Sequence, residues 1–529
     1  MKDGVYCHMR FQLINCTLLL LMSLPGTSFA QQVDNAPFSF KDSAKLRAYS
    51  NFSQNSYSTP FDSSSRQITF NDDLPIFTDP TPAVSGLTGR GNTVGEQRRN
   101  ATLAATSIIE SQLRFTQPVH IEFSTSDLNC NSFGVGTYNR SFVNGPDQIP
   151  NTIYPIALAS QLGQTDRTPD GTADVLVILN SNILFGQCER AYNYSLIAKS
   201  FPFTNSIDYI DLVLHEISHG LGFEIRPPGA QLPFVFEQFL FAKDEGTVFG
   251  LLNNEARAAA AEKVKNVVFT GTLTNDQARR TLRPRTALSI NDSGVELEFD
   301  VNEVVGTPPV RGQGIRAALV NLDFNTCEPQ GNLFGKIVVM ASGCAREELG
   351  FDGTRFGGIE LAQRRGARAV IIDSGNTSFR QSIFTSIRIP VASVLFSEYR
   401  TLEALAANGT QARLFADFRN SGGTDEQGRP YVFTGPNVPI GVEILHFDPS
   451  ISVRARTGKT TRALQEPIIS RTSQEPVSRS LGFNIPALID IGWAAPNCGN
   501  LRVERYEQCD DGNMISGDGC EQNCLLPKN

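Results

Sequence analysis

Histidine, tryptophan and long apolar runs are scarce in this chain of 529 residues, which has five His and one Trp. No apolar run after residue 30 approaches the roughly 20 residues that a bilayer span requires, so we expect no stable membrane insertion. The formal net charge is −8 and no basic patch stands out in the sequence, which predicts no nucleic-acid partner. The hydrophobic share of 40% is that of a folded globular protein, long enough for two to four domains.

The first 30 residues have the pattern of a secretory signal. Lys2 and Arg10 flank the start of an apolar run over residues 11–24, and the small residues Ser28 and Ala30 follow it. This order of segments predicts cleavage after Ala30 and a secreted protein.

Eight cysteines remain once Cys7 and Cys16 leave with the signal, and an even number in an exported chain favours disulfides. They fall into local groups that predict the pairs Cys130–Cys188 and Cys327–Cys344. Two further bridges are expected within the last four, in one of three possible connectivities: Cys498, Cys509, Cys520 and Cys524.

Residues 211–224, DLVLHEISHGLGFE, contain two candidate metal ligands and a candidate general base. In a helix, His215 and His219 stand one turn apart on one face and can bind a Zn²⁺ ion at about 2.0 to 2.1 Å each. Glu216 then lies beside the metal, where it can act as general base toward a bound water whose pKa the ion lowers to about 7. This is the H-E-x-x-H pattern. Asn205 and Ser206 are the expected N-caps, and Gly220 and Gly222 the expected stop.

A catalytic zinc site takes three protein ligands and keeps one position open. The position six residues after His219, which supplies the third ligand in metzincins, is Ile225. His120 lies in an expected strand and reads as a structural histidine. We prefer His446 as the third ligand because zinc binds imidazole readily and few imidazoles are available, with two acidic alternatives left open: Glu237, which would give a His₂Glu site, and Glu224.

The apolar patterns predict an α/β arrangement. A helix over residues 98–115 and strands over 119–124 and 173–179 precede the histidine helix, which we expect to pack on a sheet. Residues 31–95 are rich in Ser, Asn and Pro and read as a flexible segment or pro-segment. From residue 307 strands and helices alternate again, which indicates a second α/β unit.

Three stretches of that second unit resemble the protease-associated domain, an insert of secreted peptidases: GKIVVMASGC at 335–344, ELAQRRGARAVIID at 360–373 and IPVASV at 389–394. The resemblance implies a binding or access-modulating role. HEISHGLGF at 215–223 with HFD at 446–448 resembles the leishmanolysin-like zinc metalloproteases, which implies a zincin-like catalytic domain with His446 as the third ligand. LQEP at 464–467 stands where such families often have a Met-containing turn.

The last residues resemble a short cysteine-rich repeat at the ends of secreted bacterial proteins. Four cysteines so close together predict a small module held by bridges. Asp510, Asp511, Asn513 and Asp518 either offer oxygen ligands to Ca²⁺ or are turn-forming residues, and both readings stay open.

The expected organisation is a signal (1–30), a flexible or pro-segment (31–95), a catalytic domain in two parts (96–306 and 421–496), the protease-associated insert (307–420) and the cysteine-rich repeat (497–529). The predicted function is that of a secreted zinc endopeptidase acting on polypeptides. The alternative is a catalytically inactive extracellular binding protein that acts through the insert and the tail.

Overall fold

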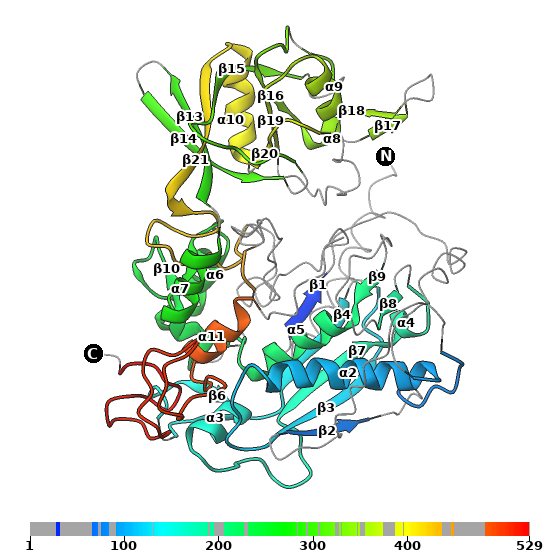
Figure 1. Cartoon of the computed structure of the whole chain (residues 1–529), viewed down its shortest axis with the longest axis vertical. Coiled ribbons are helices and arrows are strands. Elements are labelled where there is room, and N and C mark those ends of the chain that lie inside the picture. Colours follow the sequence, from blue (N-terminus) through cyan, green and yellow to red (C-terminus); the bar gives the residue numbers. More distant parts are fainter. Residues whose placement is uncertain are drawn as a thin grey trace, which may run out of the picture.

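The chain folds into two units with separate hydrophobic cores, shown one above the other in Figure 1. The structure is a computed structural model that describes residues 28–31, 66–71, 76–83, 91–435, 446–448 and 482–527. Gaps within 91–435 are at 131, 146, 189–190, 195–205, 227–230, 283, 293–294, 305–306, 323–326, 330, 346, 350–354, 374–386 and 395. Residues 1–27 of the expected signal, most of 31–95 and the LQEP stretch lie outside the described residues. The coarse expectation of a mixed α/β protein is confirmed.

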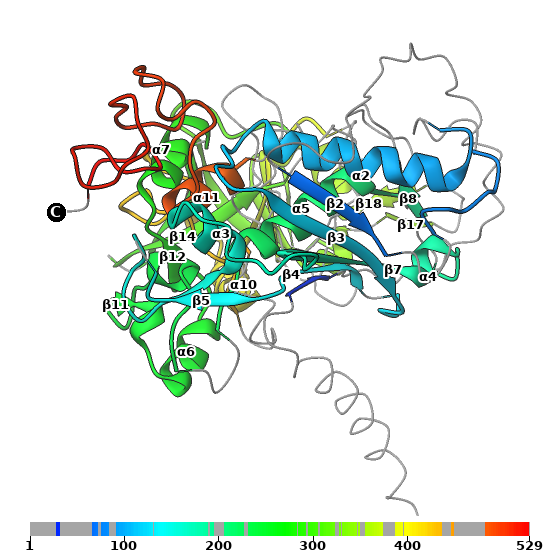
Figure 2. The same ribbon diagram turned by 90° about the horizontal axis from the view of Figure 1, so that it is seen from below.

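A five-stranded sheet is the base of the lower unit. Its strands run in the order β1 (Ser28–Gln31), β4 (Ser132–Tyr138), β7 (Val175–Asn180), β3 (Val119–Ser126) and β2 (Arg66–Phe70). β2, β3 and β7 are parallel, whereas β4 is antiparallel to both β7 and β1. α2 (Val94–Glu110) and α5 (Tyr209–Leu221) pack against each other over this sheet, as Figure 2 shows from below. β2 therefore places part of the segment 31–95 in a regular strand.

Smaller elements surround the sheet. They are β5 (Ser141–Val143), β6 (Ile153–Pro155), α3 (Ile156–Leu162), α4 (Ser181–Leu184), β8 (Ala191–Asn193), β9 (Ser206–Asp208), η2 (Phe236–Phe239), β10 (Leu240–Ala242), β11 (Thr247–Val248), η3 (Phe249–Leu251), α6 (Asn254–Ala261), β12 (Val267–Phe269), α7 (Thr272–Thr281) and α11 (Asn484–Asp490). The Ala-rich stretch from Asn254 forms helix α6 only as far as Ala261, and β12 begins at Val267.

The histidine helix α5 begins later than its sequence pattern suggests. Asn205 and Ser206 were the expected N-caps, but Asp208 is the cap, and its carboxylate accepts hydrogen bonds from the amides of Ile210 and Asp211. The expectation fails because Ser206–Asp208 is extended and pairs with β8 as strand β9. Gly220 lies inside the helix, and Gly222, with φ of 136°, ends it.

Two glycines of β4 let α5 lie unusually close to the sheet. A Cβ built on Gly136 would lie 1.8 Å from the backbone oxygen of Glu216, and one on Gly134 would lie 3.1 Å from the Glu216 Cγ. Gly220 faces the sheet in the same way, because its Cβ would lie 2.3 Å from a methyl of Val175. The backbone of the H-E-x-x-H turn therefore rests directly on β4 at positions that tolerate no side chain.

The upper unit is a closed barrel in the order β13 (Pro284–Asp292), β14 (Val295–Glu303), β20 (Val391–Val394), β19 (Ala369–Asp373), β16 (Ile337–Met340), β15 (Ile315–Asn321) and β21 (Gln411–Ser421). Its other elements are α8 (Ser342–Ala345), β17 (Glu347–Leu349), β18 (Arg355–Gly357), α9 (Gly358–Arg364) and α10 (Phe396–Ala407). The barrel includes β13 and β14, which precede residue 307. β13 pairs with both β14 and β21. Because β13 is the first strand of the barrel and β21 the last, the chain enters and leaves the barrel on neighbouring strands.

The described cysteines form four disulfides. The predicted pairs Cys130–Cys188 and Cys327–Cys344 are confirmed, and the tail adopts Cys498–Cys524 and Cys509–Cys520. Disulfides of this kind are typical of proteins in an oxidising, extracytoplasmic compartment. Within the described part of the chain, no helix combines the length and apolar character needed to cross a membrane.

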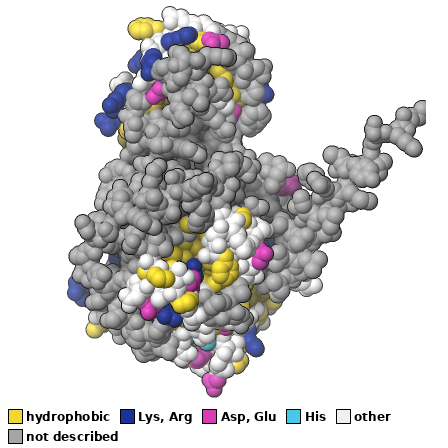
Figure 3. Space-filling model, turned by 90° about the vertical axis from the view of Figure 1, so that its right-hand side faces the viewer, with side chains coloured by type: hydrophobic (Ala, Val, Ile, Leu, Met, Phe, Trp, Pro, Cys, Tyr) yellow, Lys and Arg dark blue, Asp and Glu magenta, His cyan; other side chains and the backbone are white. Residues whose placement is uncertain are grey.

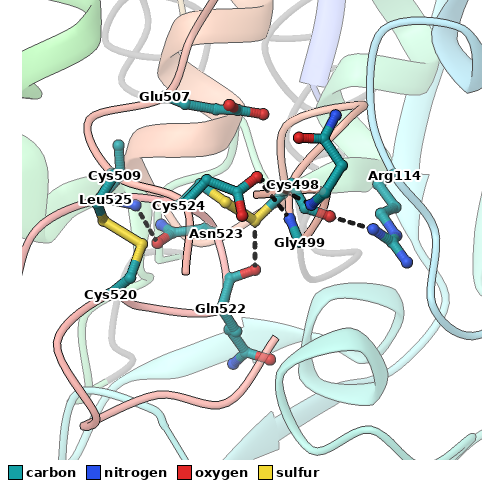
Figure 4. The surroundings of a disulfide bond; sticks show 12 residues. Arg114, Cys498, Gly499, Glu507, Cys509, Cys520, Gln522, Asn523, Cys524 and Leu525 are labelled. Atoms are coloured by element: carbon teal, nitrogen blue, oxygen red, sulfur yellow. Dashed lines mark hydrogen bonds between the residues drawn. A yellow bond between two sulfur atoms is a disulfide. The ribbon is translucent and has the colours of Figure 1, made fainter. Parts of the chain in front are cut away.

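The tail module is fastened to the lower unit by polar contacts. Arg114 donates to the carbonyl oxygen of Cys498, beside the Cys498–Cys524 bridge (Figure 4). Gln522 donates to the carbonyl of Leu162 at 3.2 Å and Asn523 to that of Ile489 at 3.1 Å. These carbonyls belong to the last turns of α3 and α11, where helix carbonyls lack partners within the helix, so the module caps two helix ends.

We predict that Gly136→Ala destabilises the lower unit by about 1–3 kcal/mol, because the methyl group would overlap the backbone of α5. The single tryptophan, Trp493, is fully buried in the core of this unit, so its fluorescence reports on this unit during thermal unfolding. The expected change is a fall of roughly 2–4 °C in the midpoint per kcal/mol.

Gly343→Ala is the matched control, because a Cβ at Gly343 in the barrel meets nothing within 4 Å. An unchanged Trp493 midpoint in Gly136→Ala would contradict the close approach of α5 to β4.

Candidate metal centre

Three imidazoles converge at the C-terminal half of α5. The Nε2 atoms of His215 and His219 lie 3.2 Å apart, and the Nε2 atoms of His215 and His446 lie 3.3 Å apart. All three side chains are at most 1% exposed. The structure thus brings together the three histidines that the sequence singled out, across 231 residues in the case of His215 and His446.

These spacings fit a zinc ion. Two nitrogens bound to a tetrahedral ion at about 2.0 to 2.1 Å each are about 3.3 to 3.4 Å apart. Three imidazoles supply nitrogen ligands, which zinc prefers. Among the residues that the structure describes, these three also form one of two groups whose geometry suits a metal ion.

A hydrogen bond fixes the tautomer of His219. Its Nδ1 lies 2.8 Å from the carbonyl oxygen of Phe223, to which only a protonated Nδ1 can donate. The lone pair of Nε2 is therefore directed at the cluster, as metal binding requires. Burial lowers the pKa of His219 well below its usual value, and the neighbouring His215 and His446 lower it further, so the ring is neutral.

His446 is held in place by backbone pairing on the far side of the site. Its carbonyl accepts from the amide of Phe433 at 2.8 Å, and the amide of Asp448 donates to Tyr431 at 3.0 Å. Residues 431–433 in turn pair with β12, so this short ladder extends the sheet of β10 and β12. The adjacent Phe447 is buried among Phe223, Phe269 and Phe483, which fixes the direction of His446.

Glu216 directly follows His215 on α5, and its side chain is buried. It is 0% exposed, and neither carboxylate oxygen has a well-formed hydrogen bond to any described residue, although the Gly136 amide lies near enough to favour the ionised form. Burial outweighs this effect and raises the pKa of Glu216 well above its usual value. A buried carboxyl with unused oxygens suits a group that exchanges a proton with a reactant.

The acidic alternatives for the third ligand lie elsewhere. Glu237 accepts from the amides of Arg226 at 3.0 Å and Phe234 at 2.7 Å, and its other oxygen pairs with Arg257. This fully buried carboxylate anchors the loop after α5, so its oxygens are already used. Glu224 is buried directly after α5 but does not join the group of ligand atoms among the described residues.

His120 has a structural role, as its strand position suggested. Its Nε2 lies 2.7 Å from the Thr69 hydroxyl, and its Nδ1 lies 3.0 Å from the carbonyl of Thr172. The ring therefore ties β2 and β3 to the turn before β7.

The second group suited to a metal is Glu507, Asp510 and Cys524 in the tail, but it does not support a calcium site. The Asp510 carboxylate accepts from the amides of Gly499, Asn500, Leu501 and Gly512, and these hydrogen bonds lower its pKa. Asn513 donates to Asp518. Cys524 is held in a disulfide, so the turn-forming reading of the tail is favoured.

Comparisons with known proteins cover only parts of the chain. Residues 494–525 match a family model described as a domain of unknown function (DUF4215). No curated protein matches the chain. Among solved structures, a zinc aminopeptidase from Bacillus subtilis is 21% identical, with 27% of this chain and 35% of that chain covered and a TM-score of 0.18. A peptidase M28 precursor from Shewanella amazonensis is 21% identical, with coverage of 26% and 35% and a TM-score of 0.19.

A psychrophilic subtilisin-like protease from an Antarctic Pseudoalteromonas is 17% identical, with 29% of this chain and 36% of that chain covered and a TM-score of 0.18. The chain thus spans about a third of the length of these solved structures. TM-scores of this size assign neither a fold nor an activity to the chain.

We predict that His446→Ala lowers zinc affinity by more than about 100-fold, because a lost ligand exceeds the 10–100-fold effect of a lost outer-shell partner. Glu237→Gln keeps its zinc but unfolds more readily, because Arg226 and Arg257 lose their buried charge partner. Zinc per folded chain, measured by elemental analysis after gel filtration, separates the two variants.

His120→Ala is the matched histidine control and is expected to retain zinc. Retention of zinc at wild-type affinity by His446→Ala, or its loss in Glu237→Gln with the fold intact, would contradict the assignment of the third ligand.

Proposed function

We propose that the protein is a secreted zinc endopeptidase in which His215, His219 and His446 hold the ion and Glu216 is the general base. The observation that carries the proposal is the convergence of three Nε2 atoms at zinc spacing, two of them from the helix that also carries the buried Glu216. On this proposal the lower unit is a zincin-like catalytic domain, and the barrel is the protease-associated insert. The predicted signal, with cleavage after Ala30, and the four disulfides support export.

Each side chain has a definite task in peptide hydrolysis. A zinc ion held here supplies Lewis acidity toward a carbonyl oxygen and makes a water molecule acidic near neutral pH. Glu216 accepts the proton of the attacking water and later delivers it to the nitrogen of the leaving amine. Burial supports the first step, because a raised pKa makes the Glu216 carboxylate a stronger base toward a proton of water.

The edge of β4 at which β1 pairs is where we expect the substrate backbone to lie. In the described chain, β1 occupies this edge, antiparallel to β4 with Phe29 opposite Val135. Cleavage after Ala30 would divide β1 and leave the edge of β4 open to another strand. We infer that a polypeptide substrate takes this position by strand addition, next to the helix that carries Glu216.

Glu216→Gln is expected to lower the rate of peptide cleavage by about 10² to 10⁴-fold, because general base catalysis is lost while all three imidazoles remain. The measurement is cleavage of a quenched fluorescent peptide library, with products identified by mass spectrometry and zinc content measured in parallel. Full activity in Glu216→Gln would refute its role as base.

Removal of zinc by a chelator is expected to abolish cleavage, and stoichiometric Zn²⁺ to restore it, because the ion would supply the Lewis acidity that the reaction needs. The apoprotein retains the disulfides and separate cores and should stay folded by circular dichroism. Stoichiometric zinc binding by a wild-type protein that cleaves no library member would favour the non-catalytic binding protein instead.

A further inference from the structure

Six basic side chains lie together where the strands of the barrel begin. They are Arg316 of β15, Arg413 of β21, Lys336 and Arg368, which directly precede β16 and β19, Arg365 at the end of α9, and Arg388 before β20. We call this surface the basic edge. Figure 3 shows Lys and Arg side chains along one flank of the barrel unit, beside hydrophobic side chains.

The barrel register forces these residues together. β16 and β19 are parallel with Ile337 opposite Ala369, and the amide of Arg368 donates to the carbonyl of Lys336 at 2.8 Å. The guanidinium of Arg368 reaches the carbonyl of Arg316 at 3.1 Å. Arg316 is directly opposite Arg413 in the antiparallel pair of β15 and β21. Like charges at directly opposite positions destabilise a sheet, so the arrangement is not explained by stability.

The basic edge also differs from other arginines of the barrel in its ion pairing. Within the described part of the barrel, none of its six side chains forms an ion pair with a carboxylate, whereas other arginines of the barrel do. Arg285 pairs with Glu298, Arg400 with Glu403 at 2.8 Å, and Arg419 with Asp417 at 3.4 Å. Among the residues that the structure describes, no ion pair therefore balances the positive charge of the basic edge.

An exposed aromatic ring lies within the basic edge. Phe334 is 73% exposed and two residues from Lys336. A Cβ built on Gly366 would lie 2.5 Å from the Phe334 ring, so the ring rests on the glycine that separates Arg365 from Arg368. A ring supported in this way offers a flat apolar platform between cations.

We propose that the basic edge binds acidic, aromatic- or aliphatic-containing segments of polypeptides and thereby selects substrates for the catalytic unit. Carboxylates pair with the unbalanced guanidinium groups, and an apolar side chain of the same segment covers Phe334. The selection of substrates by the basic edge rests on the proposed peptidase function. The binding of acidic segments by the basic edge rests on the geometry of the barrel alone.

A polypeptide fits this surface better than other polyanions. A sulfated oligosaccharide offers anions but no apolar group to cover Phe334. An anionic bilayer offers both, but insertion into a bilayer calls for a protruding apolar wedge, whereas the Phe334 ring lies against the Gly366 backbone.

The test uses the full chain carrying Glu216→Gln, so that binding is measured without cleavage. The probe is a fluorescein-labelled peptide of alternating Glu and Phe, followed by anisotropy at several salt concentrations. The double variant Arg316→Glu with Arg368→Glu is expected to weaken binding by at least ~10-fold, and binding by the unaltered edge should fall steeply with salt because exposed charges are screened. Phe334→Ala should weaken it by a smaller factor.

Arg400→Glu with Arg419→Glu is the matched control for charge reversal, because both arginines are exposed on the barrel but are ion-paired, and it should bind the peptide as well as the parent. A Gln-for-Glu version of the peptide should not bind. Equal binding by the double variant and the parent would overturn the proposal. So would stronger binding of a heparin oligosaccharide or of phosphatidylserine vesicles, independent of Phe334.

Cleavage by the chain with an intact Glu216 separates this proposal from the proposed function. If short neutral peptides are cleaved but acidic segments do not bind, the basic edge proposal fails alone. If acidic segments bind but nothing is cleaved, the peptidase function fails and the binding surface stands.

Discussion

The lower unit depends on holding three imidazoles together in a region closed to solvent, with the Nε2 of His215 3.2 Å from that of His219 and 3.3 Å from that of His446. A cation bound at the centre would stabilise this arrangement, because imidazole nitrogens are ligands that zinc prefers. The surrounding contacts hold the three rings in place. α5 is fixed on β4, the Phe223 carbonyl orients His219, and the ladder from β12 delivers His446. Each contact serves to place one nitrogen.

The chain reaches this site twice, once before and once after the barrel. Paired strands β13 and β21 keep the entry to the barrel and the exit from it together, so the returning chain comes back to the lower unit near where it left. α11 then closes the core beneath α5: Asn484 donates to Ser218 at 3.0 Å, and the Trp493 ring nitrogen to the Leu221 carbonyl at 2.8 Å. The barrel is therefore inserted without interrupting the core that supports the site, and its surface is separate from that site.

Much of the site could be predicted because its residues are rare. With five histidines in the chain, elimination left His446, and the structure places it against His215. The pairs Cys130–Cys188 and Cys327–Cys344 followed from local grouping, whereas the pairing of the last four cysteines required the structure. The start of α5 was missed because Asp208 is the cap only once Ser206–Asp208 pairs with β8, which is a tertiary effect. The glycines of β4 had a local signal, GVG within an apolar strand, whose meaning required the partner helix. The basic edge had no signal, since its residues meet only through the barrel register.

X-ray absorption at the zinc edge of the loaded protein tests the central claim most directly, because scattering from imidazole rings distinguishes histidine from carboxylate ligands. The arrangement of His215, His219 and His446 predicts three imidazoles and one oxygen donor, at about 2.0 to 2.1 Å for the nitrogens. A spectrum with two imidazoles and two oxygen donors would mean that a carboxylate completes the site, and would contradict the account.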